Sequence, residues 1–368
     1  MILDGTKIGW YHDRVRAWER GEKIAPITVD MALTTSCNLK CKFCYASLQH
    51  NKKYKITREH MTSFLNDCAE MGVKGVSLVS DGESSISDAF EHTIIHGHSV
   101  GLAMAVGSNA LLVTPGMQKR ILPKLTYFRV NISAGERLAY NDIMGAHGNM
   151  YSRVVDNIRS MVELKRLGKH SCTIGMQMVL MPEFIGQVLP LSRLALDLGV
   201  DYLIIKHCSD DEFGSLGVDY GKYKETYAIL KEAEALSTDC TQIKVKWSKI
   251  DECSESGANR SYSHCYGPPF LLQISGTGLV APCGMLFNDR YKRYHMGNIT
   301  QESFRSIIQS ARYWEVIREL ACGDFDAKKM CGSLCLQHSV NKFLNEYIKG
   351  KRKLIEPTGK QPQHKEFV

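Results

Sequence analysis

Cys37-Asn38-Leu39-Lys40-Cys41-Lys42-Phe43-Cys44 is the most informative stretch of this chain. Three thiolates in the spacing CxxxCxxC suit three irons of a cubane iron–sulfur cluster, and the fourth iron is then left without a protein ligand. An open iron can chelate a substrate or a cofactor, which a cluster closed by four cysteines cannot do. With 13 cysteines in 368 residues, random placement gives only about 0.02 such triplets.

A zinc site and a disulfide framework are the two alternatives for this triplet. Zinc sites usually close four ligands through CxxC pairs, so CxxxCxxC fits only half of an unusual one. The polar run Asp4-Gly5-Thr6-Lys7 stands close to the start of the chain, and no secretion signal is visible. Thirteen cysteines without such a signal indicate thiolate chemistry in a reducing compartment, and we expect a cytoplasmic protein. No segment approaches the ~20 apolar residues that a membrane span needs.

The triplet, the aromatic Tyr45 directly after it and its place near the N-terminus resemble the radical S-adenosylmethionine (radical SAM) superfamily. The resemblance implies that the open iron of a [4Fe-4S] cluster binds the amino and carboxylate groups of SAM. It implies that one electron cleaves SAM, and that the resulting 5′-deoxyadenosyl radical takes a hydrogen atom from a substrate carbon. A reductase, flavodoxin or ferredoxin is then expected as the electron donor.

From Ile24 onward, apolar runs typical of strands alternate with helical patterns. The first helix after the triplet begins well, because Thr57 can cap it. The predicted strands are Ile27–Leu33, Gly75–Ser80, Leu102–Val106, Tyr127–Ile132, Cys172–Leu180 and Tyr202–Lys206. The later helices are predicted over residues 86–99, 115–122, 151–167, 184–198 and 221–236.

Six strands that are each followed by a helix predict an α/β fold with a parallel sheet and right-handed crossovers. The resemblance implies a partial (β/α)6 TIM-like barrel, whereas the pattern alone leaves a flat doubly wound sheet open. In both folds, ligands bind at the carboxyl ends of the strands. The CxxxCxxC loop follows the first strand, so we expect the cluster at that end.

Four regions are predicted along the chain. They are an N-terminal lead-in (1–24), a radical SAM partial barrel (25–240), a small α+β domain for an auxiliary cluster (241–348) and a basic polar tail (349–368). We expect the basic run 349–353 to be a solvated end, and the final dozen residues, from Glu356 onward, to be loosely held.

The strand ends supply candidate residues for SAM binding. Gly82 and Glu83 stand where the superfamily has its GGE motif, whose backbone and carboxylate hold the ammonium of SAM, but Asp81 replaces the first glycine. The resemblance also implies Tyr45, directly after the triplet, as a SAM-binding candidate. Further candidates that it implies at the ends of the third, fourth and fifth strands are Ser108, Asn109, Ser133 and Gln177. Plain structural hydrogen bonding is the alternative role for these polar groups.

The sixth strand ends in Lys206-His207-Cys208, which are the candidate catalytic residues. A lysine or histidine at this edge could act as a general base or bind an anionic group. Cys208 could give a hydrogen atom to a substrate radical, because S–H bonds are weak. The alternative is a surface loop without chemistry.

A second cysteine set begins with Cys265 and Cys283 in the spacing CX12GX4C, which resembles the auxiliary-cluster domains of many radical SAM enzymes. A predicted hairpin of residues 271–275 and 278–281 would bring these two together, and Cys331 and Cys335 supply a second pair. Four thiolates suit one auxiliary [4Fe-4S] cluster, as in the short "twitch" version of the SPASM domain. Two clusters that also use Cys253 and Cys322 stay open, as does a four-thiolate zinc site.

The function predicted first is hydrogen abstraction from a small polar substrate, which we expect to be a sugar, cyclitol or nucleotide sugar. Oxidation of an alcohol by a dehydrogenase comes first and epimerisation second. The alternative is a maturase that modifies a peptide or sulfatase side chain. The net charge of +7 is compatible with an anionic substrate. A zinc-bearing nucleic-acid-binding module is a remote alternative, because aromatic residues interleaved with basic ones are rare in this chain.

Overall fold

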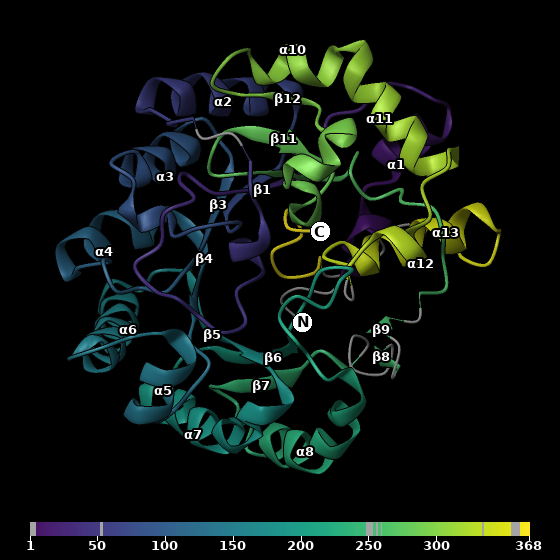
Figure 1. The fold of residues 1–368 in the computed structure, drawn as a ribbon. Helices are drawn as coiled ribbons and strands as arrows, with labels where there is room; N and C mark the ends of the chain where they lie inside the picture. The colour runs from purple at the N-terminus through teal and green to yellow at the C-terminus, as the bar shows by residue number, and fades with distance from the viewer. Residues whose placement is uncertain are drawn as a thin grey trace.

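We describe a computed structural model of the chain, which places residues 5–51, 54–247, 253–254, 257–258, 260–332, 335–354 and 361–368. A single sheet of ten strands dominates it, in the order β12-β11-β10-β1-β2-β3-β4-β5-β6-β7. From β10 to β7 all neighbours are parallel. The sheet curves into an open barrel with helices on its convex side (Figure 1). The predicted α/β partial barrel is confirmed.

The strands of this sheet agree closely with the six predicted ones and add further members. They are β1 (Thr28–Met31), β2 (Gly75–Leu78), β3 (Ala103–Ser108), β4 (Leu125–Asn131), β5 (Thr173–Leu180), β6 (Tyr202–His207), β7 (Gln242–Val245), β10 (Leu271–Ile274), β11 (Leu279–Ala281) and β12 (Gly297–Asn298). A separate small hairpin joins β8 (Cys253–Ser254) to β9 (Gly257–Ala258).

The helices between the barrel strands agree with the predicted ones, and α1, α5, α12 and α13 were not predicted. They are α1 (His12–Glu19), α2 (Arg58–Met71), α3 (Phe90–Ser99), α4 (Pro115–Ile121), α5 (Arg137–Met144), α6 (Met150–Gly168), α7 (Val188–Leu198), α8 (Tyr227–Ala235), α10 (Phe304–Gln309), α11 (Ala311–Cys322), α12 (Ala327–Met330) and α13 (His338–Ile348). Thr57 does cap α2, and His60 completes a capping box with it.

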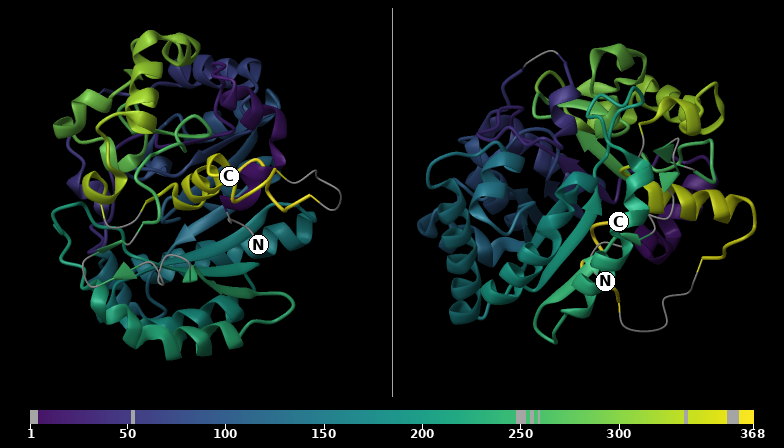
Figure 2. Two further views of the ribbon diagram at one scale, coloured as in Figure 1. Left: turned by 90° about the vertical axis from the view of Figure 1, so that its right-hand side faces the viewer. Right: turned by 60° about the horizontal axis from the view of Figure 1, so that its bottom comes forward.

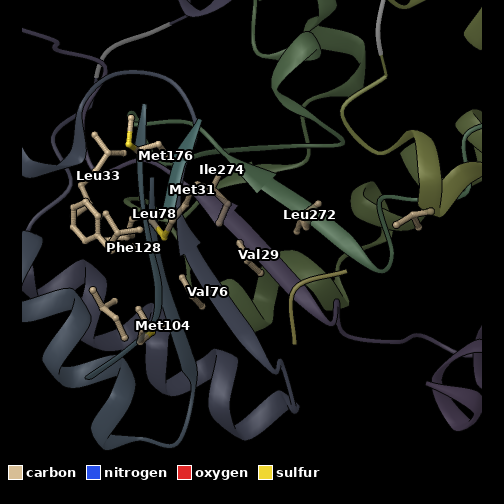
Figure 3. Packing of buried hydrophobic residues seen from close by; sticks show 14 of the residues in the cluster. Val29, Met31, Leu33, Val76, Leu78, Met104, Phe128, Met176, Leu272 and Ile274 are labelled. Carbon is tan, nitrogen blue, oxygen red and sulfur yellow. The ribbon is translucent and has the colours of Figure 1, made fainter. Parts of the chain in front are cut away.

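Alternation along β1 and β2 separates an apolar outer face from a polar inner face. Val29, Met31, Val76 and Leu78 belong to the hydrophobic core that packs under the helices (Figure 3). The residues between them, Asp30 and its partner Ser77, therefore face the barrel interior together with Gln273 of β10.

The C-terminal region is continuous with the barrel, because its first hairpin strand, β10, pairs in parallel with β1. The helices that follow gather at this end of the sheet, opposite α7 and α8 (Figures 1 and 2). The local sequence pattern predicts the β10–β11 hairpin, but it says nothing about which barrel strand this hairpin joins.

The last eight residues correct the expectation of a loosely held end. Phe367 is only 2% exposed and packs edge-to-face on Tyr127, with ring centroids 5.0 Å apart. Thr28 Oγ1 donates to the Glu366 carbonyl at 2.7 Å, and Lys7 Nζ donates to the His364 carbonyl at 2.8 Å. One aromatic ring in a polar stretch thus anchors residues 361–368 inside the amino end of the barrel, whereas Lys349, Lys351 and Lys353 are exposed as expected.

Among the helices that the structure describes, none combines the length and the apolar character needed to cross a bilayer.

Removing the Phe367 ring is expected to destabilise the protein strongly. Phe367→Ala leaves a hole between β3 and β4, and burial of a phenylalanine at such a site is worth about 3–5 kcal/mol. Phe213→Ala is the matched control, because Phe213 is 72% exposed and its loss should cost less than about 1 kcal/mol. Thermal unfolding followed by circular dichroism measures both. Equal midpoints for the two variants would contradict the anchoring role.

Candidate functional site

The CxxxCxxC loop lies at the carboxyl end of β1 and is held against α5. Lys40 N donates to the Met144 carbonyl at 3.2 Å, and Lys42 N donates to the Ile143 carbonyl at 3.0 Å. Burial is the main cause that raises the pKa of the Cys41 thiol, and the nearby Cys44 and Cys37 raise it further. Three neighbouring thiols lose their protons readily only when cations lie beside them. The iron ions of an iron–sulfur cluster are such cations.

Gly82 and Glu83 link the end of β2 to this loop. Gly82 has a φ of +79°, and a Cβ at this position would overlap the Thr34 carbonyl, so only glycine fits. Glu83 N donates to the Ser36 carbonyl at 2.9 Å. The two loops therefore touch through backbone atoms.

The Glu83 carboxylate is occupied by groups of the chain itself. It accepts hydrogen bonds from Ser85 N (3.1 Å), Ser85 Oγ (2.6 Å), Ser108 Oγ (2.7 Å) and Asn109 N (2.7 Å). Three of these hydrogen bonds reach Oε1 and only one reaches Oε2, so Oε2 keeps room for a further donor. The side chain thus holds β3 against β2, and its contact with the ammonium of SAM stays a prediction.

Asn109 extends the same network to the cysteine loop. Its Nδ2 donates to Asn38 Oδ1 at 2.7 Å, and Asn38 stands between Cys37 and Cys41. The predicted residues Ser108 and Asn109 are thus brought to the cysteine loop, as supports for it.

Asp81, the residue that departs from the family motif, ties the barrel to the C-terminal hairpin. Its carboxylate accepts from Ser275 Oγ at 2.6 Å and from Gly276 N at 2.8 Å. Burial raises the pKa of Asp81, so these two hydrogen bonds compensate for the removal of the carboxylate from water.

Of the two residues predicted at the ends of β4 and β5, Ser133 makes a hydrogen bond within the protein and Gln177 faces the barrel interior. Ser133 Oγ accepts from Val179 N at 3.1 Å, which is a structural hydrogen bond. Gln177 faces the barrel interior and donates to Asn131 Oδ1 at 3.0 Å, so it remains a candidate for contact with a ligand.

The three candidates at the end of β6 point in different directions. Lys206 pairs in register with Val179 and faces the interior. His207 lies on the opposite face, where its ring packs edge-on against Tyr223 at 5.3 Å, so we do not retain it as a catalytic candidate. Cys208 Sγ donates to the Phe43 carbonyl at 3.6 Å, and burial raises its pKa to about 12, which keeps the thiol protonated beside the cysteine loop.

The four auxiliary cysteines form one group. Burial is the main cause that raises the pKa of Cys283, and the charges of Cys265 and Cys335 raise it further. Burial likewise raises the pKa of Cys331, and the charges of the other three cysteines add to this effect. Cys322 lies apart: it is exposed at the end of α11 and donates to the Arg318 carbonyl. Cys253 lies in β8, and nothing is described of its side chain.

Each cysteine set matches the irons of a cubane by number, with three thiols in the cysteine loop and four in the auxiliary set. In a cubane, each thiolate has its own iron.

Two residues that the sequence analysis missed complete the auxiliary site. Asn341 Nδ2 points at Cys265 Sγ (3.4 Å) and Cys335 Sγ (3.6 Å). Arg260 is buried and donates to the Ala327 and Gly332 carbonyls, while its Nε has no partner among the described residues. Burial by itself would lower the pKa of Arg260, but the thiols of Cys335 and Cys331 raise it. A buried cation beside four thiols is the surrounding that an anionic cluster requires.

Tyr45 connects the two cysteine groups. Its hydroxyl lies against Gly284, where an added Cβ would come within 2.8 Å of it, and Gly284 directly follows Cys283. The residue predicted at the SAM site is therefore also a contact between the cysteine loop and the auxiliary site.

Asp30 and Arg129 are the other residues that were missed. Both interrupt apolar runs of buried strands, ITVDMAL and LTYFRVN, and a charged residue in the middle of such a run was the available signal.

Comparison with known families agrees with this geometry. A sequence model of the radical SAM superfamily matches residues 31–188, and a model of the SPASM iron–sulfur cluster-binding domain matches residues 265–336. The first range contains the CxxxCxxC loop and the second contains all four auxiliary cysteines. A [4Fe-4S] cluster with SAM, together with an auxiliary iron–sulfur site, follows from these two domains.

Relatives with known names align over most of the chain. The "AdoMet-dependent heme synthase" of Methanosarcina barkeri is 23% identical over 83% of this chain and 90% of its own length. "Mycofactocin maturase MftC" of Mycolicibacterium smegmatis is 21% identical over 85% and 79%. The structure of Streptococcus suis SuiB bound to precursor peptide SuiA has a TM-score of 0.62 at 15% identity, covering 88% of this chain and 74% of that one. This last likeness concerns the fold alone.

Iron content tests the assignment of the auxiliary cysteines. Two cubanes give about eight irons per chain, and Cys331→Ala should retain about four of them, because the cluster of the cysteine loop is untouched. Cys322→Ala is the matched control and should retain the full content. Iron and sulfide analysis of anaerobically reconstituted protein measures this. A wild-type content of about twelve irons would instead support two auxiliary clusters.

Loss of the Asp81 carboxylate is expected to loosen the contact between barrel and hairpin. Asp81→Ala removes two charge-assisted hydrogen bonds, which together are worth about 3 kcal/mol, and should lower the thermal midpoint by several degrees. Asp142→Ala is the control, because Asp142 forms an exposed ion pair with Lys42 that should contribute less than about 1 kcal/mol. Equal midpoints would show that the tie to Ser275 and Gly276 adds nothing to stability.

Proposed function

This chain is a radical SAM enzyme with a C-terminal SPASM-type domain, and on that premise we propose that it is a maturase, which modifies a peptide or a cofactor precursor at a carbon atom. The observation that carries the proposal is similarity over 83% and 85% of the chain to proteins named as a heme synthase and a mycofactocin maturase. The sugar or cyclitol dehydrogenase predicted first is the second candidate, because neither of these relatives is named as one.

In this proposal, some residues at the carboxyl ends of β1 to β3 bind the cluster and others hold the loop in place. Cys37, Cys41 and Cys44 would hold the cluster, and the bound cluster with SAM would supply a 5′-deoxyadenosyl radical that takes a hydrogen atom from the substrate. Glu83 and Asn109 fix the loop through their hydrogen bonds to Ser108 and Asn38.

The auxiliary site is suited to moving electrons. Its four thiols match the four irons of a cubane, so no iron is left for the substrate. Removal of a hydrogen atom leaves a substrate radical, and loss of one further electron with a proton completes a two-electron oxidation. The Tyr45 contact with Gly284 places the two cysteine groups on either side of one aromatic side chain.

Substrate-dependent SAM cleavage tests the function. Anaerobically reconstituted enzyme with a strong reductant should release 5′-deoxyadenosine faster with a pool of linear peptides and carboxylated tetrapyrroles than with a pool of sugar phosphates and nucleotide sugars. Product mass then gives the reaction type, since oxidation removes two hydrogens and epimerisation removes none. Cys44→Ala is the blank and should release none. Stimulation by the sugar pool alone would establish the second candidate in place of the maturase.

A further inference from the structure

The side-chain amide of Asn341, in α13, has only one orientation that satisfies its neighbours. The residue is fully buried, and its Oδ1 accepts from Tyr266 N at 2.7 Å and from Gly267 N at 2.9 Å. Both of these contacts require an acceptor, so they fix which end of the amide is the oxygen. The two hydrogens on Nδ2 are thereby directed at the sulfurs of Cys265 (3.4 Å) and Cys335 (3.6 Å).

Arg260 brings a full positive charge to the same group of sulfurs. It is 3% exposed, and its two terminal nitrogens donate to the carbonyls of Ala327 and Gly332, the second of which directly follows Cys331. Burial by itself would lower the pKa of Arg260, but the thiolate charges of Cys335 and Cys331 raise it. The cost of burying this cation is therefore offset by the sulfurs beside it.

Donors and cations in this position act on the reduction potential of a cluster. Four thiolates outweigh the positive charge of a cubane core, so the site is an anion, and reduction by one electron makes it more negative. Hydrogen bonds to sulfur and a neighbouring cation stabilise the more negative form to a greater extent than the less negative one. Because Asn341 and Arg260 are buried, the low local dielectric strengthens both effects. Each of the two residues therefore favours the reduced cluster.

We propose that Asn341 and Arg260 raise the reduction potential of the auxiliary cluster and thereby make it the acceptor of the second electron in the reaction. That electron comes from the substrate radical left by hydrogen abstraction, while the accompanying proton passes to solvent. The inference rests on the proposed function, in which the auxiliary cluster moves electrons. Both are positioning residues, because they act on the cluster and not on the substrate.

A redox titration of the anaerobic holoenzyme, followed by electron paramagnetic resonance, measures this potential. SAM changes the signal of the cluster that it binds, so the signal that SAM leaves unchanged belongs to the auxiliary cluster. Asn341→Leu should make reduction of the auxiliary cluster about tenfold less favourable, a drop of about 59 mV for one electron. Asn341→Asp should lower the potential at least as far, because it keeps an acceptor for Tyr266 N and Gly267 N but puts a negative oxygen in place of the donor.

Each variant has a matched control. Asn345→Leu should leave the potential unchanged, because Asn345 lies one turn further along α13 and donates to the carbonyls of His264 and Asn341 instead of to sulfur. Arg260→Gln should lower the potential by a similar factor, whereas Arg260→Lys should retain most of it, because lysine keeps the charge. Arg312→Gln is the control for Arg260, since Arg312 also donates to two backbone carbonyls but is exposed.

Two further readouts separate tuning of the cluster from damage to the fold. The iron content and the potential of the SAM-binding cluster should be the same in every variant. An unchanged potential in Asn341→Asp and Arg260→Gln would overturn the proposal, as would an equal drop in the two controls. A site that holds zinc, and so gives no second signal, would overturn it as well. Because the titration uses no substrate, SAM cleavage that responds only to sugars would refute the maturase and leave the assigned role of these two residues in place.

Discussion

Two buried carboxylates on either side of Gly82 hold the two halves of the site together. Asp81 accepts from the turn of the β10–β11 hairpin, while Glu83 accepts from the end of β3. The left-handed conformation of Gly82 lets the chain turn sharply between them against the Thr34 carbonyl. Consecutive residues thus fix the cysteine loop from two sides, and a buried carboxylate is suited to this because each of its oxygens accepts more than one hydrogen bond.

Parallel pairing of β10 with β1 has a direct consequence for the cysteines. The CxxxCxxC loop leaves the carboxyl end of β1, and the chain leaves β10 at the same end, since the two strands run in one direction. Cys283 follows the hairpin and is thereby brought beside Tyr45. The second cysteine set therefore reaches the first through the sheet itself.

Much of this fold could be predicted from the sequence, because the six barrel strands are mainly apolar runs that alternate with helical patterns. The position of the hairpin could not, since the choice of a neighbouring strand depends on contacts between residues far apart in the chain. The same limit applies to Phe367, whose polar surroundings indicate exposure although its ring is buried on Tyr127. His207 was misjudged for a local reason: successive residues at a strand end face opposite sides, so Lys206 and His207 cannot both face the interior.

Hydrogen-atom abstraction, the step proposed for this chain, makes its own demand on the protein around the substrate. A neutral atom is transferred, so little charge develops for fixed dipoles to stabilise, unlike the reactions that oxyanion holes accelerate. The protein contributes mainly by position, because the radical takes whichever hydrogen is held within reach.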